Sequence, residues 1–525
     1  MDDSRSEGIS LAGRRVSRRA FLGGAAATLA ATALPARFLG PVGAPPSSGG
    51  YPFSLGVASG DPLPDGVVLW TRLAPDPLAG GGMPARGVTV RWQVASDDRM
   101  RTIVRSGTAT ARPEHGHAVH VDVQRLEPGR PYWYRFVAGD DETPIARTRT
   151  APADHVLPNR LRFAHVSCQR FDQGYYTAYA DLAEHDLDLV LHVGDYIYEY
   201  SGGPVRDPML PTPVTLDDYR LRYALYKSDE HLQTAHAIAP WLVTWDDHEV
   251  ENNYTSDSPV PGSLTPDTAS FLPRRAAAYR AWWEHQPVRL PAPTGPRARI
   301  YRRSSMGRLA TIHVLDTRQY RTDQTCGVGD IGARCEAAFD PATTVLGPAQ
   351  ERWLGAGLRG NDARWNVLAN QVVMQQWRFA PGNAVWNLDQ WDGYPVAPGP
   401  LLAPRRARGV ADTVALTGDV HSSWVGTLAE DFDDPSSSVV GVEFVGPAVS
   451  TTPSRALAGI EPTIHENSPH LRWSETTRQG WVLHDVRPDE WRADYRLVDN
   501  VLVQGAPVTT ASSWVVRHGG KLDEA

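Results

Sequence analysis

The pattern of hydrophobic and polar residues divides the chain near residue 150. Between residues 51 and 150, short runs rich in β-branched and aromatic residues are separated by turn residues. These runs predict strands over residues 53–58, 67–72, 88–95, 118–123 and 132–137. Strands at this spacing predict a β-sandwich domain over residues 51–150. Because this segment holds no cluster of His, Asp and Cys, we expect it to have a supporting or interacting role.

One motif refines the prediction for this N-terminal domain. Leu126, Pro128 and Tyr132 stand at the Leu-x-Pro-x-x-x-Tyr spacing of a tyrosine corner. The motif resembles that of fibronectin type III domains. The resemblance implies a fibronectin-III-like sandwich.

Beyond a linker that contains Pro and Asp, the pattern changes to apolar runs that end abruptly in polar residues. Helix-like stretches such as residues 175–184 and 274–285 lie between them. The apolar runs cover residues 161–166, 187–193, 241–244, 309–315, 365–369 and 414–416. This alternation predicts a multidomain chain whose second domain, residues 158–505, is a layered α/β domain. Residues 506–525 are left as a C-terminal tail.

The polar residues that end these apolar runs are of kinds that bind metals. They include Cys168, Asp195, Asp247, His248, Asp316, Asn370, Asp419 and His421. In open α/β sheets, ligands bind outside the carboxyl ends of the strands, so we expect these side chains to converge. A single strand-ending Asp is most often a turn or helix-cap residue. Six strand ends of this kind together predict one polynuclear metal site.

The three cysteines support a metal site. Cys326 and Cys335 lie nine positions apart in a Gly-rich segment, a separation that a local disulfide can close after export. Cys168 is then left without a partner. An unpaired thiol in an exported protein is either a metal-bound thiolate or a buried, inert side chain, and the neighbouring ligand types favour the thiolate.

Composition and charge narrow the range of functions. The chain has 525 residues with 41% hydrophobic residues and 17 Trp, enough for large packed cores, which excludes wholesale disorder. A formal net charge of -8 provides no broad positive field, so we expect no nucleic-acid interface. The sequence also lacks a Gly-x-Ser-x-Gly elbow, a Walker motif and a His-Glu-x-x-His zinc motif.

The N-terminal residues resemble a twin-arginine export signal. Ser17, Arg18, Arg19 and Phe21 precede an uncharged Ala-rich run that ends near Leu34. This run is too short to span a bilayer, and no Cys nearby offers a lipid attachment point. We therefore expect a signal peptide over residues 1–36 and a linker over residues 37–50. The protein is then a twin-arginine translocase substrate, secreted or periplasmic, with no stable membrane anchor.

The motifs of the second domain resemble the PhoD-type alkaline phosphatases and phosphodiesterases, which are related to purple acid phosphatases and other calcineurin-like metallophosphoesterases. The resemblance runs from residues 53–62 to residues 419–424 and implies a four-layer α/β/β/α catalytic domain. In Gly194-Asp195-x-x-Tyr198 it implies that Asp195 bridges two metals and that Tyr198 binds Fe(III) as a phenolate. It also implies that Asp247 is a second-metal ligand and that His248 is an uncoordinated catalytic residue.

Two departures from the superfamily pattern bear on the second metal. Asn370 and Asp419 stand where the superfamily has histidines, which makes the second site an all-oxygen one that suits Ca²⁺, with Mg²⁺ or Mn²⁺ as substitutes. Gln371 or Asn252 offers an alternative to Asn370. The first site keeps the thiolate, carboxylate, phenolate and imidazole that suit Fe(III), from Cys168, Asp195, Tyr198 and His421.

The sequence thus predicts an exported, metal-dependent alkaline phosphatase or phosphodiesterase in which a metal-bound hydroxide attacks phosphorus in line. We expect small or polymeric phosphate esters as substrates and a monomeric protein. A phospholipase D-like activity on lipid head groups is an alternative, as is a secreted, non-catalytic binding protein with structural metals.

Three further segments have two interpretations each. Asp316 and Arg318 either line the site or form an ordinary ion pair at a strand end. The Trp-rich residues 377–391 either wall a substrate pocket or pack in the core. Residues 506–525 either form a tail or, as the resemblance suggests, a cap over the active site.

Overall fold

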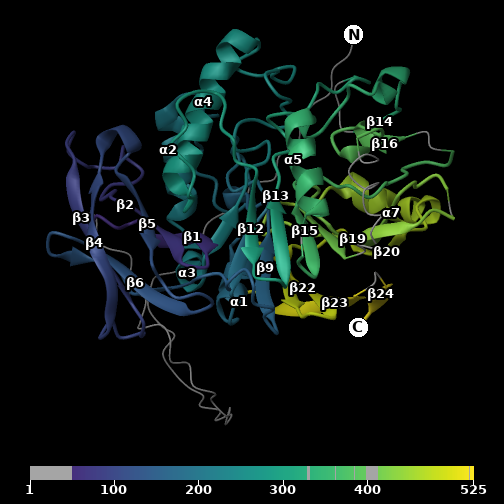
Figure 1. Ribbon diagram of the computed structural model, residues 1–525. Helices are drawn as coiled ribbons and strands as arrows, with labels where there is room; N and C mark the ends of the chain where they lie inside the picture. The colour runs from purple at the N-terminus through teal and green to yellow at the C-terminus, as the bar shows by residue number, and fades with distance from the viewer. Residues whose placement is uncertain are drawn as a thin grey trace, which may run out of the picture. The chain divides into compact units, whose positions relative to one another are not determined.

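Two large β-sheets and a smaller one form the scaffold of the computed structural model, which describes residues 50–327, 331–360, 362–382, 385–397, 412–434, 436–518 and 521–525. The predicted signal peptide and all but the last residue of the predicted linker lie outside the described residues. The largest sheet has the strand order β24-β23-β22-β21-β9-β10-β11-β1-β2-β5, and the second has the order β12-β13-β15-β17-β19-β18-β20. The described chain is therefore β-rich and built from several sheets (Figure 1).

Parallel strands form the centre of both large sheets. In the first sheet, β9 (Leu161–Val166), β10 (Leu189–His192) and β11 (Trp241–Val243) run parallel to one another. In the second sheet, β13 (Ala310–Val314), β15 (Trp365–Ala369) and β17 (Thr413–Thr417) do the same. These strands are almost wholly buried, as their near-continuous apolar sequences predict. The loops that leave each parallel set emerge at one edge of its sheet.

The remaining strands complete these two sheets. The first sheet gains β21 (Gly480–Val486), β22 (Glu490–Val498), β23 (Val508–Arg517) and β24 (Lys521–Glu524). The second gains β12 (Arg302–Met306), β18 (Ser423–Ala429), β19 (Val439–Val445) and β20 (Leu471–Glu475). A separate pair joins β14 (Ile331–Gly332) to β16 (Trp386–Asn387).

Hydrophobic cores hold sheets and helices together. One core lies between the two large sheets and includes Phe163 and Leu191 from one and Ile312 and Val367 from the other. A second core packs helices against the ten-stranded sheet: α1 (Thr177–Ala183), α2 (Leu216–Lys227), α3 (Glu230–Ile238) and α4 (Thr268–His285). Two further cores pack α5 (Gly347–Arg359) and α7 (Arg455–Asn467) against the seven-stranded sheet.

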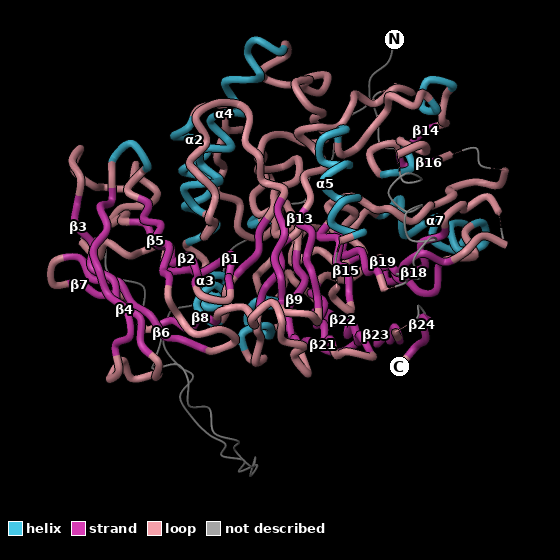
Figure 2. The backbone as a smooth tube through the Cα atoms, viewed as in Figure 1, coloured by secondary structure: helices cyan, strands magenta, loops and turns pink. Residues whose placement is uncertain are grey.

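Three strands of the N-terminal segment belong to the same sheet as strands of the second domain. Its strands β1 (Val57–Leu63), β2 (Gly66–Arg72) and β5 (Ala118–Gln124) belong to the ten-stranded sheet, in which β1 pairs in parallel with β11. A five-stranded sheet packs against them through a shared core (Figure 2). It contains β3 (Val88–Ala95), β4 (Ile103–Ala111), β6 (Pro131–Ala138), β7 (Asp141–Glu142) and β8 (Ala146–Arg149). The predicted boundary near residue 150 therefore crosses a continuous sheet.

The C-terminal residues differ from the prediction. Residues predicted to be a tail or a cap form β23 and β24, which pair in antiparallel fashion at the end of the ten-stranded sheet. The alternating pattern of β23 explains this, because Trp514 and Val516 belong to the core between the two large sheets. The cap interpretation is wrong for these strands.

Two smaller expectations concern disulfides and membranes. Cys326 and Cys335 form the predicted disulfide, with a Cα–Cα distance of 5.3 Å, and Cys168 is a buried free cysteine. Among the described residues, no helix has the length and apolar character needed to cross a membrane.

An ion pair between buried Asp61 and partly buried Arg302 joins the N-terminal segment to both large sheets. The Asp61 carboxylate accepts hydrogen bonds from Arg302 Nε at 2.9 Å and Nη2 at 2.7 Å, and from the backbone N–H of Arg289 at 2.8 Å. Arg302 also donates to the carbonyl of Val243 at 3.0 Å. Asp61 lies in β1 and Arg302 in β12, so this pair links the sheets at their junction.

We expect Asp61→Asn to lower the free energy of unfolding by about 2 kcal/mol, because it leaves the largely buried Arg302 guanidinium, 16% exposed, without its counter-charge. Asp122→Asn is the matched control. Asp122 also pairs with an arginine, Arg289, but the Asp122 side chain is 40% exposed. The control change is expected to cost less than about 1 kcal/mol. Urea unfolding followed by tryptophan fluorescence measures both. Equal stabilities of the two variants would contradict the role given to Asp61.

Candidate metal centre

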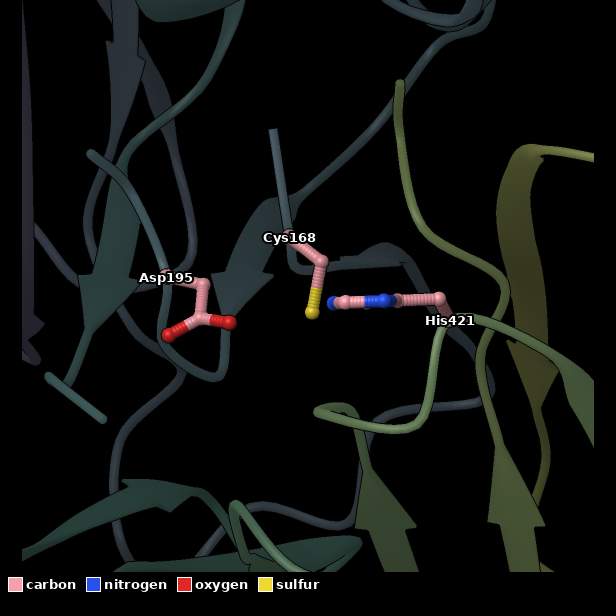
Figure 3. A group of neighbouring side chains, drawn as sticks. All are labelled: Cys168, Asp195 and His421. Atoms are coloured by element: carbon pink, nitrogen blue, oxygen red, sulfur yellow. The ribbon is translucent and has the colours of Figure 1, made fainter. Parts of the chain in front are cut away.

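The loops that follow the parallel strands bring metal-binding side chains together. Three groups each have ligand atoms within 4.8 Å of one another: Cys168, Asp195 and His421; Asp195, Asp247 and His248; and Asp246, Asp247 and Asp419. Asp195 belongs to two groups and Asp247 to two, so the three groups form one continuous cluster. Figure 3 shows the Cys168 sulfur, the Asp195 carboxylate and the His421 ring directed toward a common space.

Tyr198 completes the first group. Its hydroxyl lies 2.9 Å from Asp195 Oδ2, to which it donates, and 3.0 Å from His421 Nε2. The structure therefore brings together all four side chains that the sequence predicted for the first metal. They come from the loops after β9, β10 and β17.

The backbone around the cluster adopts conformations that ordinary residues avoid. Cys168, Asp195, Asp419 and His421 have φ values of 58°, 58°, 64° and 56°. Such left-handed conformations of non-glycine residues cost about 1 kcal/mol or more each and concentrate at functional sites. Four of them in one cluster indicate that the fold stabilises side-chain positions at the expense of backbone energy.

The loop that carries Asp195 requires a glycine before it. Gly194 has φ of 118°, and a Cβ atom there would lie 2.6 Å from the Cβ of Asp246. The Glu249 carboxylate fixes the same loops, because it accepts hydrogen bonds from the backbone N–H groups of Asp195 at 3.1 Å, Tyr196 at 2.7 Å and Asp246 at 2.8 Å. The sequence analysis assigned roles to Asp247 and His248 but none to Glu249, which follows them directly.

The electrostatics of the first group favour a bound cation. Burial raises the pKa of Cys168, Asp195 and Tyr198 well above their ordinary values, and neighbouring negative charges raise it further. Burial, followed by the charge of His248, lowers the pKa of His421 to about 3, so its ring is neutral and able to coordinate. A bound metal ion would lower the pKa of the thiol, the carboxyl and the phenol again, since coordination deprotonates such groups.

Two buried carboxylate oxygens test whether the residues fit a metal. Asp195 Oδ1 and Asp247 Oδ1 are buried and accept no hydrogen bond within the described structure. Buried carboxylate oxygens are normally hydrogen-bonded or coordinated. Both belong to the cluster, so the donor set and its unsatisfied atoms fit a metal centre.

The predicted second site is less completely assembled. The Asn370 side chain donates to the carbonyl of Val372 and to Thr417 Oγ1 at 3.3 Å, and its oxygen lies 3.4 Å from the indole nitrogen of Trp391. Gln371 donates to Thr244 and to the carbonyl of Leu315. These contacts attach both amides to the carboxyl ends of the strands.

Asp419 is held by two protein donors. Its Oδ1 accepts from Arg318 Nη2 at 3.0 Å and its Oδ2 from Gln390 Nε2 at 2.7 Å. Arg318 thus lies in the cluster, whereas the carboxylate of Asp316 accepts from the backbone of Arg318 and Gln319 and caps the turn. Arg318 therefore agrees with both interpretations, since it lies in the cluster and forms ion pairs there, whereas Asp316 serves as a turn cap.

His248 lies between the cluster and Glu199. Its Nδ1 is 2.7 Å from Glu199 Oε2, and its ring centroid is 4.0 Å from that of Tyr198. Burial lowers the pKa of His248, but the charges of Glu199, Tyr200 and Asp247 outweigh this effect and raise the pKa well above its ordinary value. Sequence reasoning missed Glu199, although it directly follows Tyr198 in the recognised motif.

A pocket of about 230 Å³ opens onto the cluster. Its polar lining residues include Asp195, Asp247, His248, Asn252, Asp419 and His421. Its apolar lining residues are Ile331, Trp377, Phe379, Val420, Leu457 and Ile460. Trp386 and Trp391 are buried in the structure, so residues 377–391 contribute both to the pocket wall and to packing.

Comparisons with known proteins agree with this site. The family model of the PhoD-like phosphatases matches residues 163–495, and the model of the N-terminal domain of PhoD-like phosphatases matches residues 40–152. These matches define the class of protein: the chain is an enzyme, a phosphoric ester hydrolase.

The chain belongs to the PhoD-like phosphatase family. It is 45% identical over 485 residues to alkaline phosphatase D of Bacillus subtilis (strain 168), an alignment that covers 90% of this chain and 82% of that protein. It also superimposes on the solved structure of PhoD with a TM-score of 0.87 and 43% identity, covering 91% of this chain and 93% of the other. Neither the phospholipase alternative nor the non-catalytic one is favoured by these matches.

We expect Gly194→Ala to lower the rate of phosphate ester hydrolysis about a hundredfold, because the added Cβ must displace Asp246 and move Asp195 with it. Gly459→Ala is the control, since a Cβ at this helical position meets no atom within 4 Å. Hydrolysis rates of both variants, measured beside their thermal stability, test this. Wild-type activity in Gly194→Ala would show that the close approach is not needed.

Proposed function

We propose that this enzyme is an exported, metal-dependent alkaline phosphatase and phosphodiesterase. The observation that carries the proposal is the convergence of Cys168, Asp195, Tyr198 and His421, with the Tyr198 hydroxyl 2.9 Å and 3.0 Å from its two neighbours. A thiolate, a phenolate, a carboxylate and an imidazole together suit ferric iron.

The proposed second cation is Ca²⁺, which Mg²⁺ or Mn²⁺ can replace. Asp195 and Asp247 would hold it through their unsatisfied oxygens, with Asp419 and Asn370 as further oxygen donors. Asn252, which lines the pocket, remains the alternative to Asn370. Asp195 would then bridge the two cations, in agreement with its membership of two ligand groups.

When bound, the cations activate water and neutralise the charge that develops on the phosphoryl oxygens. The chain's own residues supply orientation and a proton. Asp195 and Asp247 direct free oxygens into the site, and the neutral His421 presents its ring to it. His248, which Glu199 orients at 2.7 Å and keeps protonated, is the proposed donor of a proton to the leaving-group oxygen.

The finer fold assignments belong to the same proposal. Helices on the outer faces of two sheets that share a core support a four-layer α/β/β/α catalytic domain. Tyr132 Oη accepts a hydrogen bond from the Glu127 N–H at 2.8 Å, which supports the fibronectin-III-like assignment. Export by the twin-arginine translocase and a secreted or periplasmic location rest on residues 17–22. We also propose that the enzyme is a monomer.

We expect the protein to hydrolyse bis-p-nitrophenyl phosphate and p-nitrophenyl phosphate at alkaline pH, and to lose this activity when a chelator removes its divalent cation. Calcium added back is expected to restore it, because the protein ligands remain in place. Release of p-nitrophenolate measures both steps. Full activity in protein shown by elemental analysis to be free of calcium, magnesium and manganese would contradict the divalent part of the proposal.

We expect Cys168→Ser to lower the iron affinity by about tenfold or more, because a hydroxyl is not deprotonated as readily as a thiol and leaves the ferric site with a weaker donor. The double variant Cys326→Ser, Cys335→Ser is the control, since those cysteines bond to each other. Iron-to-protein ratios after dialysis measure the effect. A Cys168→Ser protein with the wild-type iron content would remove the thiolate from the ligand set.

A further inference from the structure

Arg318 is a buried cation surrounded by carboxylates. It follows β13 and its side chain is fully inaccessible to solvent. Its guanidinium makes ion pairs with four aspartates, of which three form one of the ligand groups. The four are Asp246, Asp247 at 3.6 Å, Asp389 at 2.8 Å and Asp419 at 3.0 Å.

The fork of Arg318 fixes the orientation of several carboxylates at once. Nε and Nη2 both donate to Asp246, and Nη2 also donates to Asp419 Oδ1. Nη1 donates to Asp389 Oδ1 at 3.0 Å, which anchors the other side of the guanidinium. The planar geometry of arginine makes these simultaneous contacts possible, whereas the ammonium of lysine is a point charge that cannot reproduce them.

One oxygen of the group accepts no hydrogen bond, although it lies 3.6 Å from Arg318 Nη2. Asp246 is held through both of its oxygens, and Asp419 is held by Arg318 and Gln390. Asp247 Oδ2 accepts from the backbone N–H of Asn253 at 2.6 Å, while its Oδ1 accepts no hydrogen bond. The surrounding bonds therefore direct this unsatisfied oxygen, and set the position of Asp419 beside it.

We propose that Arg318 is a positioning residue that preorganises Asp419 and the Asp246–Asp247 pair for the second cation of the enzyme. The inference rests on the proposed function, since it assumes that Asp247 and Asp419 bind a divalent cation. Arg318 does not touch substrate in this arrangement. It acts by holding buried carboxylates, which repel one another, at a fixed geometry.

Two effects of Arg318 on cation affinity have opposite signs. Its positive charge repels a second cation, so removal of the charge alone would raise the affinity. Its hydrogen bonds hold the ligands in place, so removal of the geometry would lower the affinity, and outer contacts of this kind typically contribute about tenfold to a hundredfold in metal affinity. The proposal is that geometry outweighs repulsion.

The chain offers a matched control in Arg321. Its side chain is also fully buried and also pairs with Asp389, at 2.8 Å. Asp389 is not a member of the ligand groups, and Arg321 Nε donates to the carbonyl of Thr317 at 2.6 Å. Loss of either guanidinium disturbs the same buried region, but only Arg318 contacts Asp246, Asp247 and Asp419.

A calcium titration tests the proposal. The full-length protein with iron bound is first freed of divalent cations, and its calcium binding is then measured by isothermal titration calorimetry. We expect Arg318→Lys to bind Ca²⁺ about tenfold or more weakly than wild type, although its charge is unchanged. Arg318→Gln is expected to bind more weakly still, and Arg321→Lys to bind as wild type does. Circular dichroism and thermal unfolding identify any variant that fails to fold, and the charge-conserving lysine variant guards against that outcome.

Each result decides between the explanations. Wild-type calcium affinity in a folded Arg318→Lys variant, or a higher affinity in Arg318→Gln, would overturn the positioning role and leave a purely electrostatic one. An equal loss in Arg321→Lys would overturn it also, because the effect would then be general to the buried region. If the wild-type protein binds no calcium, the proposed second cation fails, and the role of Arg318 fails with it.

Discussion

The crowding of buried anionic side chains at one junction between two sheets is the constraint on which the rest of the structure depends. Asp195, Asp246, Asp247 and Asp419 belong to overlapping groups whose ligand atoms lie within 4.8 Å of one another, beside a buried thiol and phenol. Such groups repel one another and lose their hydration, so the fold must hold them against a substantial electrostatic cost. Three features hold these groups in place. Parallel strands end at a common edge, helices pack behind the strands, and the backbone is left-handed at four cluster positions.

Compensation for this charge comes from two sources. The protein supplies the guanidinium of Arg318, which pairs with Asp246 and Asp419, and the side-chain amide of Gln390, which donates to Asp419. The carboxylate oxygens that accept no hydrogen bond, on Asp195 and Asp247, mark where metal ions would complete it. The same region opens onto a pocket whose lining combines members of the cluster with apolar residues such as Phe379 and Leu457.

The sequence predicted the core of this arrangement because the ligands follow strands whose apolar runs are unmistakable. Cys168, Asp195 and His421 were assigned from strand ends and a motif, and the structure brings them together. Arg318 and Glu199 acquire their importance from partners 101 and 49 positions away, which no local pattern reveals. For the same reason the sequence did not show that β1 continues the central sheet through β11, or that β23 and β24 extend it, since strand pairing over such separations depends on the assembled core.

The central claim is that the Cys168, Asp195, Tyr198 and His421 cluster is a ferric site of a phosphoric ester hydrolase. Anomalous diffraction from crystals of the purified protein, recorded on both sides of the iron absorption edge, tests it most directly. The account predicts a single iron peak within bonding distance of the Cys168 sulfur and the Tyr198 hydroxyl oxygen. An iron peak elsewhere, or a cluster filled by a different metal in protein that is fully active, would contradict it.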